Sequence, residues 1–200
     1  MHPARDHYLP PDRQAFHSAR PATGRVIVIA PTPAACETIE LAMGLRLETV
    51  LETEHGSEVR ELAASGEGFG IVAGTGTGKT LAVRPMAEAI LRSPLRVGVV
   101  NREREATPET PTWNVVIVTT GIARRWFQAG LITGSDTLVV DEIHQTSAEL
   151  ELCLALGKRA GCRFIWLSAT VDPAFYARYL ESRRVIESSA FDPGRAARVR

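Results

Sequence analysis

The segment "IVAGTGTGKTLAV", from Ile71 to Val83, has the residue types and the spacing needed to hold a phosphate group. It sets glycines, threonines and one lysine between a strand-like run and a helix-like run. Glycine there costs conformational entropy, so its purpose is a turn or a close approach of the backbone to something else. The segment fits G-x-x-x-x-G-K-[ST] from position 73 onward, with Ala73 in place of the first glycine. That replacement is tolerable if the position needs no positive φ.

In such a loop the backbone N–H groups turn inward, and the helix that follows adds its positive N-terminal dipole. The residues expected to form this cradle are Gly74, Thr75, Gly76, Thr77, Gly78, Lys79 and Thr80. Lys79, expected at an exposed loop position, would reach the β- and γ-phosphates, and the Thr80 hydroxyl would coordinate Mg²⁺. The alternative is a glycine-rich turn that only reverses the chain. The strand before the loop and the helix after it favour phosphate binding.

A second informative stretch, "TLVVDEIHQ", ends an apolar strand in two carboxylates. Asp141 is placed to hold Mg²⁺, at the end of a strand that we expect to neighbour the one leading into the loop. Glu142 would orient and deprotonate an attacking water. An acidic helix N-cap is the simpler explanation of "DE" alone. The four letters D-E-I-H after a phosphate loop favour catalysis, and with it a functional role for His144.

Strands and helices alternate along the chain, which predicts a parallel sheet covered on both faces. Short β-branched runs predict strands at "RVIVIAP", "FGIVAG", "RVGVVN", "NVVIVTT", "TLVVDE" and "RFIWLSA". Helices are expected at "PAACETIELAMGL", after the phosphate loop to about Leu91, at "IARRWFQAG" and at "SAELELCLALGKRAG". "RLETVLE" suggests a further strand and "SEVRELAAS" a helix with Ser57 as its N-cap.

Composition agrees with an enzyme domain that has a substantial core. The chain has 200 residues, of which 44% are hydrophobic, and 23 basic residues balance 23 acidic ones. Any nucleic-acid contact must therefore come from local clusters of basic residues. The three cysteines lack C-x-x-C spacing, so neither a zinc knuckle nor a disulfide framework is indicated. Because the sequence has no apolar run of about 20 residues and no signal peptide, we expect no membrane contact and a cytoplasmic location, with a nuclear or virus-encoded protein left open.

The sequence resembles the superfamily 2 helicases, and within them the DEAH/DExH-box RNA helicases and their viral relatives. The resemblance rests on "AGTGTGKT" as motif I, "TTG" at 119–121 as motif Ib, "DEIH" at 141–144 as motif II and "SAT" at 168–170 as motif III. It covers about residues 66–190. It implies the first RecA-like lobe, an α/β P-loop NTPase fold with three αβα layers and a mainly parallel sheet.

The resemblance also implies ATP and Mg²⁺ as cofactors and single-stranded nucleic acid as partner, with RNA favoured over DNA. The residues it places in catalysis are Lys79, Asp141, Glu142 and His144. Ser168, Ala169 and Thr170 would couple the nucleotide state to lobe movement, although hydroxyl residues at a strand end also form ordinary turns.

By the same resemblance, Thr119, Thr120 and Gly121 would touch the nucleic-acid backbone. Arg124, at a helix start beside these hydroxyls, suits phosphate oxygens and reads no base sequence. Arg102 stands in for motif Ia after the strand "RVGVVN". Trp126 and Phe127 are better suited to the core than to base stacking.

One run departs from the helicase pattern: "VIAPTPAACETIELA" resembles motif Ia but precedes the phosphate loop. It is either an added strand–helix unit on the sheet or the sign of a rearranged chain. We expect a flexible leader at 1–24, this additional unit at 25–65, the ATP-binding lobe at 66–190 and a tail at 191–200. The second lobe, with its arginine fingers, is expected to be absent from these residues; whether the chain is a fragment or a partner supplies that lobe in trans is left open by the sequence.

Two other functions remain open from the sequence. A truncated, non-catalytic lobe could act as a nucleotide-dependent binding module, which the neutral charge and the missing second lobe allow. A P-loop translocase outside the helicases is the other, and the pairing of "SAT" with "DEIH" speaks against it.

Overall fold

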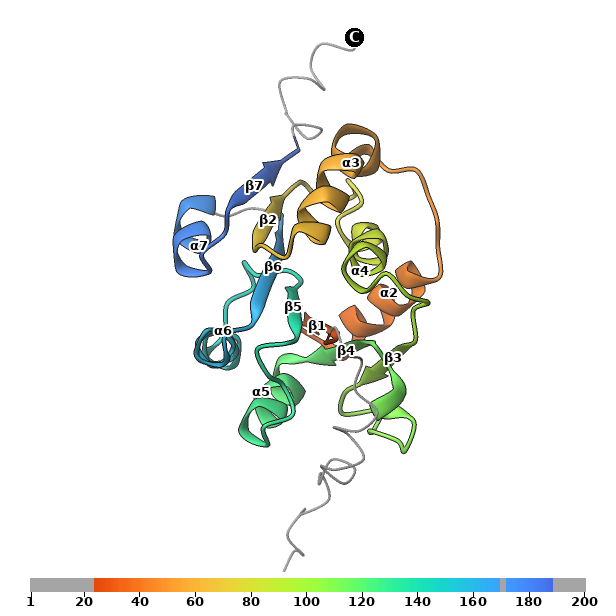
Figure 1. The fold of residues 1–200 in the computed structure, drawn as a ribbon, viewed down its shortest axis with the longest axis vertical. Coiled ribbons are helices and arrows are strands. Elements are labelled where there is room, and N and C mark those ends of the chain that lie inside the picture. Colours follow the sequence, from red (N-terminus) through yellow and green to blue (C-terminus); the bar gives the residue numbers. More distant parts are fainter. Residues whose placement is uncertain (1–23, 170–171, 189–200) are drawn as a thin grey trace, which may run out of the picture.

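The computed structural model describes residues 24–169 and 172–188 and contains one parallel sheet of seven strands (Figure 1). The spatial order is β3-β4-β1-β5-β6-β2-β7. The strands are β1 (Val26–Ala30), β2 (Phe69–Val72), β3 (Val97–Val100), β4 (Val115–Thr119), β5 (Thr137–Val140), β6 (Arg163–Ser168) and β7 (Arg184–Glu187). Every residue of β1, β4 and β5 is buried, as expected for β-branched runs in a sheet covered on both faces.

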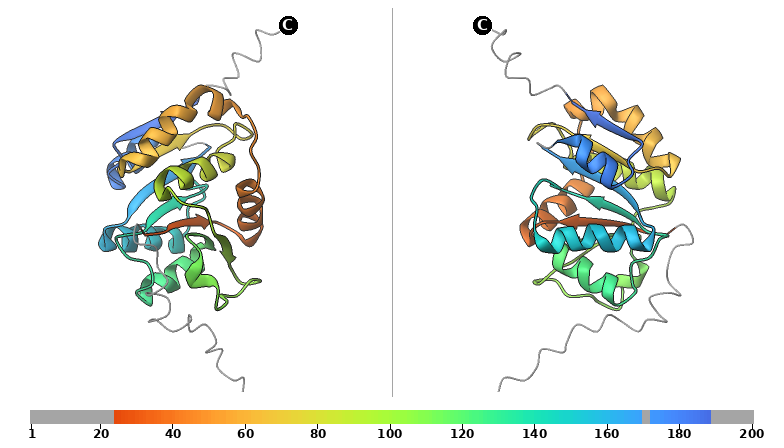
Figure 2. Two further views of the ribbon diagram at one scale, coloured as in Figure 1. Left: turned by 45° about the vertical axis from the view of Figure 1, so that its right-hand side comes forward. Right: turned by 90° about the vertical axis from the view of Figure 1, so that its left-hand side faces the viewer.

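Helices form a layer on each face of the sheet (Figure 2). They are α2 (Pro33–Met43), α3 (Val50–Ser65), α4 (Val83–Leu91), α5 (Thr120–Gln128), α6 (Ala148–Ala160) and α7 (Pro173–Tyr179), with short 3₁₀ turns η1 (Thr80–Ala82) and η2 (Thr110–Thr112). Val28 belongs to the core under α2, α3 and α4, and its neighbour Ile29 belongs to the core under α5, α6 and α7. This alternation confirms the expected three-layer α/β fold.

The segment before the phosphate loop supplies an interior strand. β1 lies between β4 and β5, with Ala30 opposite Thr119 on one side and Ile29 opposite Val140 on the other. Its start is anchored by Arg25, a residue that is 2% exposed and whose guanidinium lies 3.2 Å from the Asp136 carboxylate. The β1–α2 unit is therefore built into the middle of the sheet.

The region between α2 and the phosphate loop differs from the sequence prediction. "RLETVLE" is not a strand, and α3 begins at Val50, so Ser57 lies inside the helix and does not cap it. The cap is Thr49, whose hydroxyl accepts the Glu52 N–H at 3.1 Å. Leu51 is buried with Val59 at helical spacing, and this periodicity outweighs the local strand-like pattern.

Several expected features fall outside the described residues or were not predicted. The leader at 1–24 lies outside them apart from residue 24, and the tail at 191–200 lies outside them altogether. The sequence analysis also missed α7 and β7, of which β7 extends the sheet beyond β2. In the described part of the chain, the three cysteines are buried and form no disulfide, and no helix is long and apolar enough to cross a membrane.

Candidate nucleotide and nucleic-acid site

The phosphate loop, residues 73–80, follows the carboxyl end of β2. Two of its glycines need their conformational freedom, because φ is 81° at Gly76 and 104° at Gly78. Ala73 does not have a positive φ, and its N–H donates to the Ser168 carbonyl at 3.0 Å. The first position of the motif therefore accepts alanine without strain, as the sequence analysis required.

Lys79 is buried, with only 7% of its surface exposed, so the expectation of an exposed loop lysine was wrong. Its ammonium donates to the carbonyls of Ala73 and Gly74, the latter at 3.0 Å. Burial lowers the pKa of Lys79, while the negative charges of Glu142 and Asp141 act in the opposite direction. The amine therefore lies within the loop and in the electrostatic field of both motif II carboxylates.

Motif II, residues 141–144, follows β5, and β5 is not the neighbour of the strand that leads into the phosphate loop. β6 lies between β5 and β2, so the expected adjacency was wrong. The two sites still share one side of the fold, because the carboxyl ends of parallel strands lie along the same edge of a sheet. The residue joining them is Ser168 at the end of β6, which contacts Ala73 on one side and His144 on the other.

Asp141 has the electrostatic properties of a cation ligand. It is 6% exposed, and among the described residues its Oδ1 has no hydrogen-bond partner. Burial, and then the charge of Glu142, raise the pKa of Asp141 to about 6. An unpartnered carboxylate oxygen in a buried position is costly unless a cation or a donor reaches it, and carboxylate oxygen is a ligand that Mg²⁺ prefers.

His144 connects Glu142 to motif III. Its Nε2 lies 2.9 Å from Glu142 Oε2, and its Nδ1 lies 3.0 Å from Ser168 Oγ. The Ala169 N–H also donates to Nδ1, at 3.4 Å. The structure thus brings together Glu142, His144, Ser168 and Ala169, whereas Thr170, the last residue of the predicted coupling set, lies outside the described residues.

A second concave site lies at the carboxyl ends of β1 and β4. Its volume is about 260 Å³, and the structure brings the predicted residues together there: it is lined by Arg102, Thr119, Thr120, Gly121 and Arg124. Arg102 is exposed, and Arg124 pairs with Glu149, with 3.5 Å between Nε and Oε1. We call this site the β1–β4 groove.

Sequence reasoning missed the other wall of the β1–β4 groove, which is formed by Pro31, Thr32 and Pro33 at the start of α2. The signal was present in "APTPA", the run similar to motif Ia, but its position in the chain did not reveal its position in the sheet.

Trp126 is 2% exposed and belongs to the core with Phe127 packed against it, so the preference for core anchoring over base stacking is confirmed.

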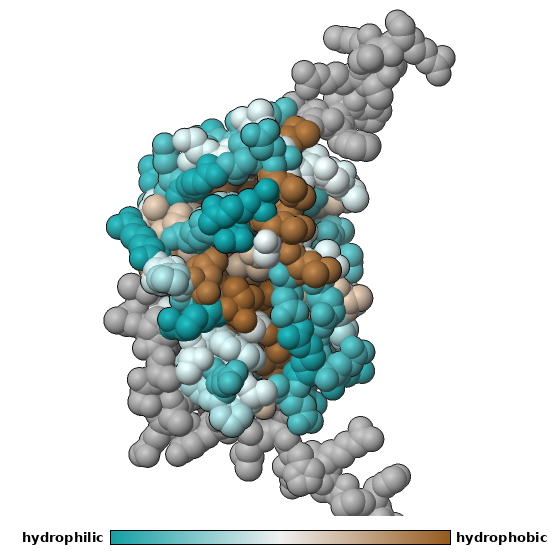
Figure 3. Space-filling model, turned by 90° about the vertical axis from the view of Figure 1, so that its right-hand side faces the viewer, coloured by the Kyte–Doolittle hydropathy of each residue, from teal (hydrophilic) through white to brown (hydrophobic). Residues whose placement is uncertain are grey.

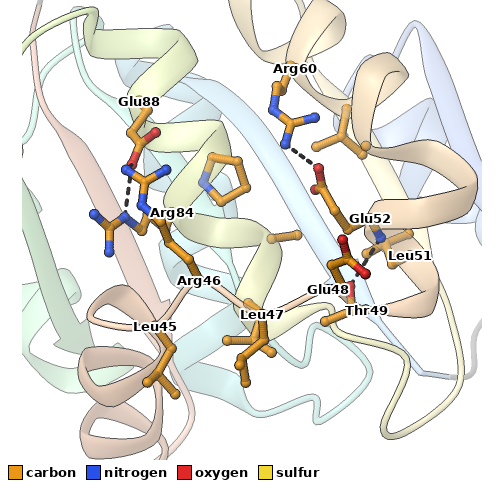
Figure 4. A pocket seen from close by; sticks show the side chains of 15 residues that line it. Leu45, Arg46, Leu47, Glu48, Thr49, Leu51, Glu52, Arg60, Arg84 and Glu88 are labelled. Atoms are coloured by element: carbon orange, nitrogen blue, oxygen red, sulfur yellow. Dashed lines mark hydrogen bonds and ion pairs between the residues drawn. The ribbon is translucent and has the colours of Figure 1, made fainter.

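A third cavity, of about 300 Å³, is lined in part by Leu81 and Ala82, which follow the phosphate loop, and it was not predicted (Figure 4). It lies between α3, α4 and the linker at 44–49, and we call it the α3–α4 groove. The Leu51 N–H donates to the Thr77 carbonyl at 3.0 Å, which ties the start of α3 to the phosphate loop. A side chain at position 78 would collide with Thr49, so the linker and the loop are in close contact there.

Apolar and charged side chains share the α3–α4 groove. Leu45 and Leu47 are 48% and 58% exposed, and Figure 3 shows an apolar band on this face of the molecule. On one rim, Glu88 accepts from both Arg46, at 3.1 Å, and Arg84, at 2.8 Å (Figure 4). The groove therefore offers apolar surface and guanidinium groups on the side of the fold where η1 follows the phosphate loop.

Comparisons with solved structures identify the fold. The helicase domain of Hef from Pyrococcus furiosus matches with a TM-score of 0.52 and 16% identity, over 74% of this chain and 40% of that one. A hypothetical ATP-dependent RNA helicase from Sulfolobus tokodaii matches with a TM-score of 0.52 and 17% identity, over 78% of this chain and 57% of that one. No protein-family model matches the sequence, and no curated protein matches it.

The chain therefore has a RecA-like α/β fold of the kind found in helicase domains. It spans less than two thirds of the length of either helicase structure. At these identities the likeness establishes the fold, and the chemistry has to be argued from the residues themselves.

Proposed function

We propose that the chain is the ATP-binding lobe of a DExH-box nucleic-acid helicase and that it couples ATP hydrolysis to strand unwinding or remodelling. The observation that carries the proposal is the grouping of Lys79 with Asp141 and Glu142 at the carboxyl edge of the sheet. A glycine-rich loop, a buried aspartate and a partly exposed glutamate in the electrostatic field of one lysine are parts that phosphoryl transfer requires.

Residues of this site fit a bound Mg²⁺ ion. The unpartnered oxygen of Asp141 and the Thr80 hydroxyl would hold it, and the ion would neutralise charge on the phosphate oxygens. Within the described ranges no group of three or more His, Cys, Asp or Glu residues could form a complete protein cage. A site with few protein ligands suits Mg²⁺, which keeps several waters and binds phosphate oxygens as well.

The chain's own side chains would carry the remaining steps. Lys79 would leave the loop carbonyls for the β- and γ-phosphates, because a phosphate offers it a charged partner. Glu142 would orient water and accept its proton, with His144 holding the carboxylate. The α3–α4 groove would receive the ribose and base, since it is a cavity of about 300 Å³ that adjoins the first turn after the phosphate loop.

Single-stranded nucleic acid, with RNA favoured, would lie in the β1–β4 groove. The N-termini of α2 and α5 meet there, and backbone N–H groups, threonine hydroxyls and arginines are the groups that contact phosphate oxygens. We infer that the β1–α2 unit performs the part expected of motif Ia and that two strand–helix units have exchanged their order in the chain. Its interior position beside β5 supports this over an added edge unit.

The test is equilibrium binding of a fluorescent ATP analogue with Mg²⁺ to the purified chain and to Lys79→Ala. We expect the parent chain to bind and the variant to lose at least tenfold in affinity, because a charge-assisted contact to phosphate is removed. Lys158→Ala, an exposed lysine on α6, is the matched control, and circular dichroism checks the fold. Equal affinity in the folded Lys79 variant would remove the phosphate-loop assignment. Binding without turnover, even when a second lobe is supplied, would favour a nucleotide-dependent binding module.

A further inference from the structure

Motif II contains one backbone conformation that calls for a physical explanation. Glu142, the proposed catalytic base, has φ of 51°, a left-handed value that costs a non-glycine residue about 1 kcal/mol or more. Such a conformation persists only where its surroundings hold it. Glu142 itself is partly exposed, so packing of its side chain does not supply the restraint.

The Glu142 carbonyl accepts the Gln145 N–H at 2.8 Å and its carboxylate contacts His144, and a further restraint comes from the next residue, Ile143. Its side chain is completely buried, and its N–H donates to the Leu167 carbonyl of β6 at 3.0 Å. Its carbonyl accepts a hydrogen bond from the Tyr176 hydroxyl at 3.3 Å. Both backbone polar groups of Ile143 are therefore bonded from outside motif II. The bond to Leu167 holds the peptide between Glu142 and Ile143, and the bond from Tyr176 holds the next peptide, between Ile143 and His144.

Tyr176 is well placed to act as a fixed support. Tyr176 is 9% exposed, and the centroid of its ring lies 5.7 Å from that of the Trp166 ring and 5.1 Å from that of the Phe175 ring. Trp166 is fixed in turn by a hydrogen bond from its Nε1 to Ser182 Oγ at 2.8 Å. Aromatic packing thus sets the position of the hydroxyl, which reaches motif II from α7, an element that the sequence did not predict.

We propose that Tyr176 is a positioning residue for catalysis: its hydroxyl holds the peptide between Ile143 and His144, and so keeps His144 in place to orient the Glu142 carboxylate that serves as base. The proposal rests on the proposed function, because it assigns a purpose to the geometry of motif II. It adds a contact from α7 to the link between motifs II and III that His144 and Ser168 form.

The test uses Tyr176→Phe, which removes the hydroxyl and leaves the ring contacts in place. We expect single-turnover ATP hydrolysis by the chain to slow about two- to tenfold, the value of one neutral hydrogen bond, with nucleotide affinity unchanged. Amide hydrogen exchange in the peptide covering residues 141–145 should be faster than in the parent. The matched control is Tyr179→Phe, which makes the same change one turn further along α7, where the ring contacts Phe175 and Lys158.

Two readouts separate this proposal from the proposed function. If the parent chain hydrolyses no ATP under any condition but Tyr176→Phe still shows faster exchange in motif II, the restraint stands and the proposed function fails. If the exchange of motif II is unchanged, the restraint is overturned. If both variants slow hydrolysis equally, or if nucleotide affinity falls in step with the rate, Tyr176 has only a structural role and the proposal is wrong.

Discussion

At the scale of single residues, Asp141 combines a buried position with a charge that the protein does not fully compensate. Its pKa is raised to about 6, chiefly by burial, and its Oδ1 lacks a partner among the described residues. The ionised carboxylate therefore costs folding free energy, and a bound cation would offset that cost. Stability and ion binding should respond in opposite directions when this one side chain is changed.

Asp141→Asn should consequently stabilise the chain at neutral pH when Mg²⁺ is absent. Because the pKa of Asp141 is higher in the folded chain than its usual 3.8, its contribution is most favourable below about pH 4 and is lost as the pH rises through about 6. We expect the variant to exceed the parent by about 1–3 kcal/mol at about pH 7.5 and to match it near pH 4. Urea unfolding at the two pH values, without Mg²⁺, measures the difference; equal stability at both would contradict the raised pKa.

Glu142→Gln should separate nucleotide binding from hydrolysis. The amide cannot accept the proton of water, so ATP and Mg²⁺ should bind with nearly unchanged affinity while single-turnover hydrolysis falls at least a hundredfold. The matched control is Glu149→Gln, an exposed carboxylate on α6 that pairs with Arg124 instead of His144. A Glu142 variant that hydrolyses ATP as fast as the parent would remove this residue from the role of base.

At the scale of elements, the β1–β4 groove is built from two strand–helix units that are far apart in the chain. Reversing charge with Arg102→Glu and Arg124→Glu should weaken single-stranded RNA binding and flatten its salt dependence, because fewer counterions are released. The matched control reverses the charges of Lys158 and Arg159, which lie in the last turn of α6. Fluorescence anisotropy at several salt concentrations measures both quantities, and an unaltered salt slope would place the nucleic acid elsewhere.

The strands and most helices could be predicted because local pattern determines them. Runs such as that of β4 are wholly buried and β-branched, and the pattern of Leu150, Cys153 and Leu154 marks the buried face of α6. The start of α3 was missed because its cap, Thr49, is a residue type that suits strands and caps equally. α7 was missed because it is only seven residues long, too short for a clear period.

The features of the candidate site also fall into those that the sequence could predict and those that it could not. Gly76, Gly78 and Lys79 could be found because backbone conformation and charge leave a recognisable spacing. The burial of Lys79 and the link from Ile143 to Tyr176 could not be found, since they depend on contacts between residues distant in the sequence. A sequence pattern indicates the chemistry of a single segment, while tertiary packing determines how each reactive group is oriented.

At the scale of the whole molecule, the order of the strands in the sheet differs from their order in the chain. The strand similar to motif Ia comes first in the chain but lies beside β5, with β5 and β6 between it and β2. In the proposed exchange of units, the carboxyl ends of the strands remain side by side whichever loops connect them. A functional edge of a parallel sheet can thus survive reordering, because the site depends on strand positions and not on the connections.

The whole-molecule prediction concerns rate. In phosphoryl transfer an arginine finger accelerates the reaction about 10³–10⁵-fold. The proposed helicase needs that arginine from a second lobe, and this chain spans only 40% and 57% of the two helicase structures it resembles. We therefore expect the isolated chain to bind ATP weakly, to hydrolyse it very slowly and to respond little to RNA, since stimulation works by closing two lobes around the nucleotide.

Steady-state ATPase measurements on the chain, with and without single-stranded RNA, test this expectation. A candidate second lobe added in trans should raise the rate by orders of magnitude, and only then should RNA stimulate it further. The same lobe with its candidate finger arginine changed to alanine is the control, because it can still close over the nucleotide but cannot neutralise charge in the transition state. Fast, RNA-stimulated turnover by the chain alone would show that its own residues complete the site, as an arginine acting between two copies of the chain would do.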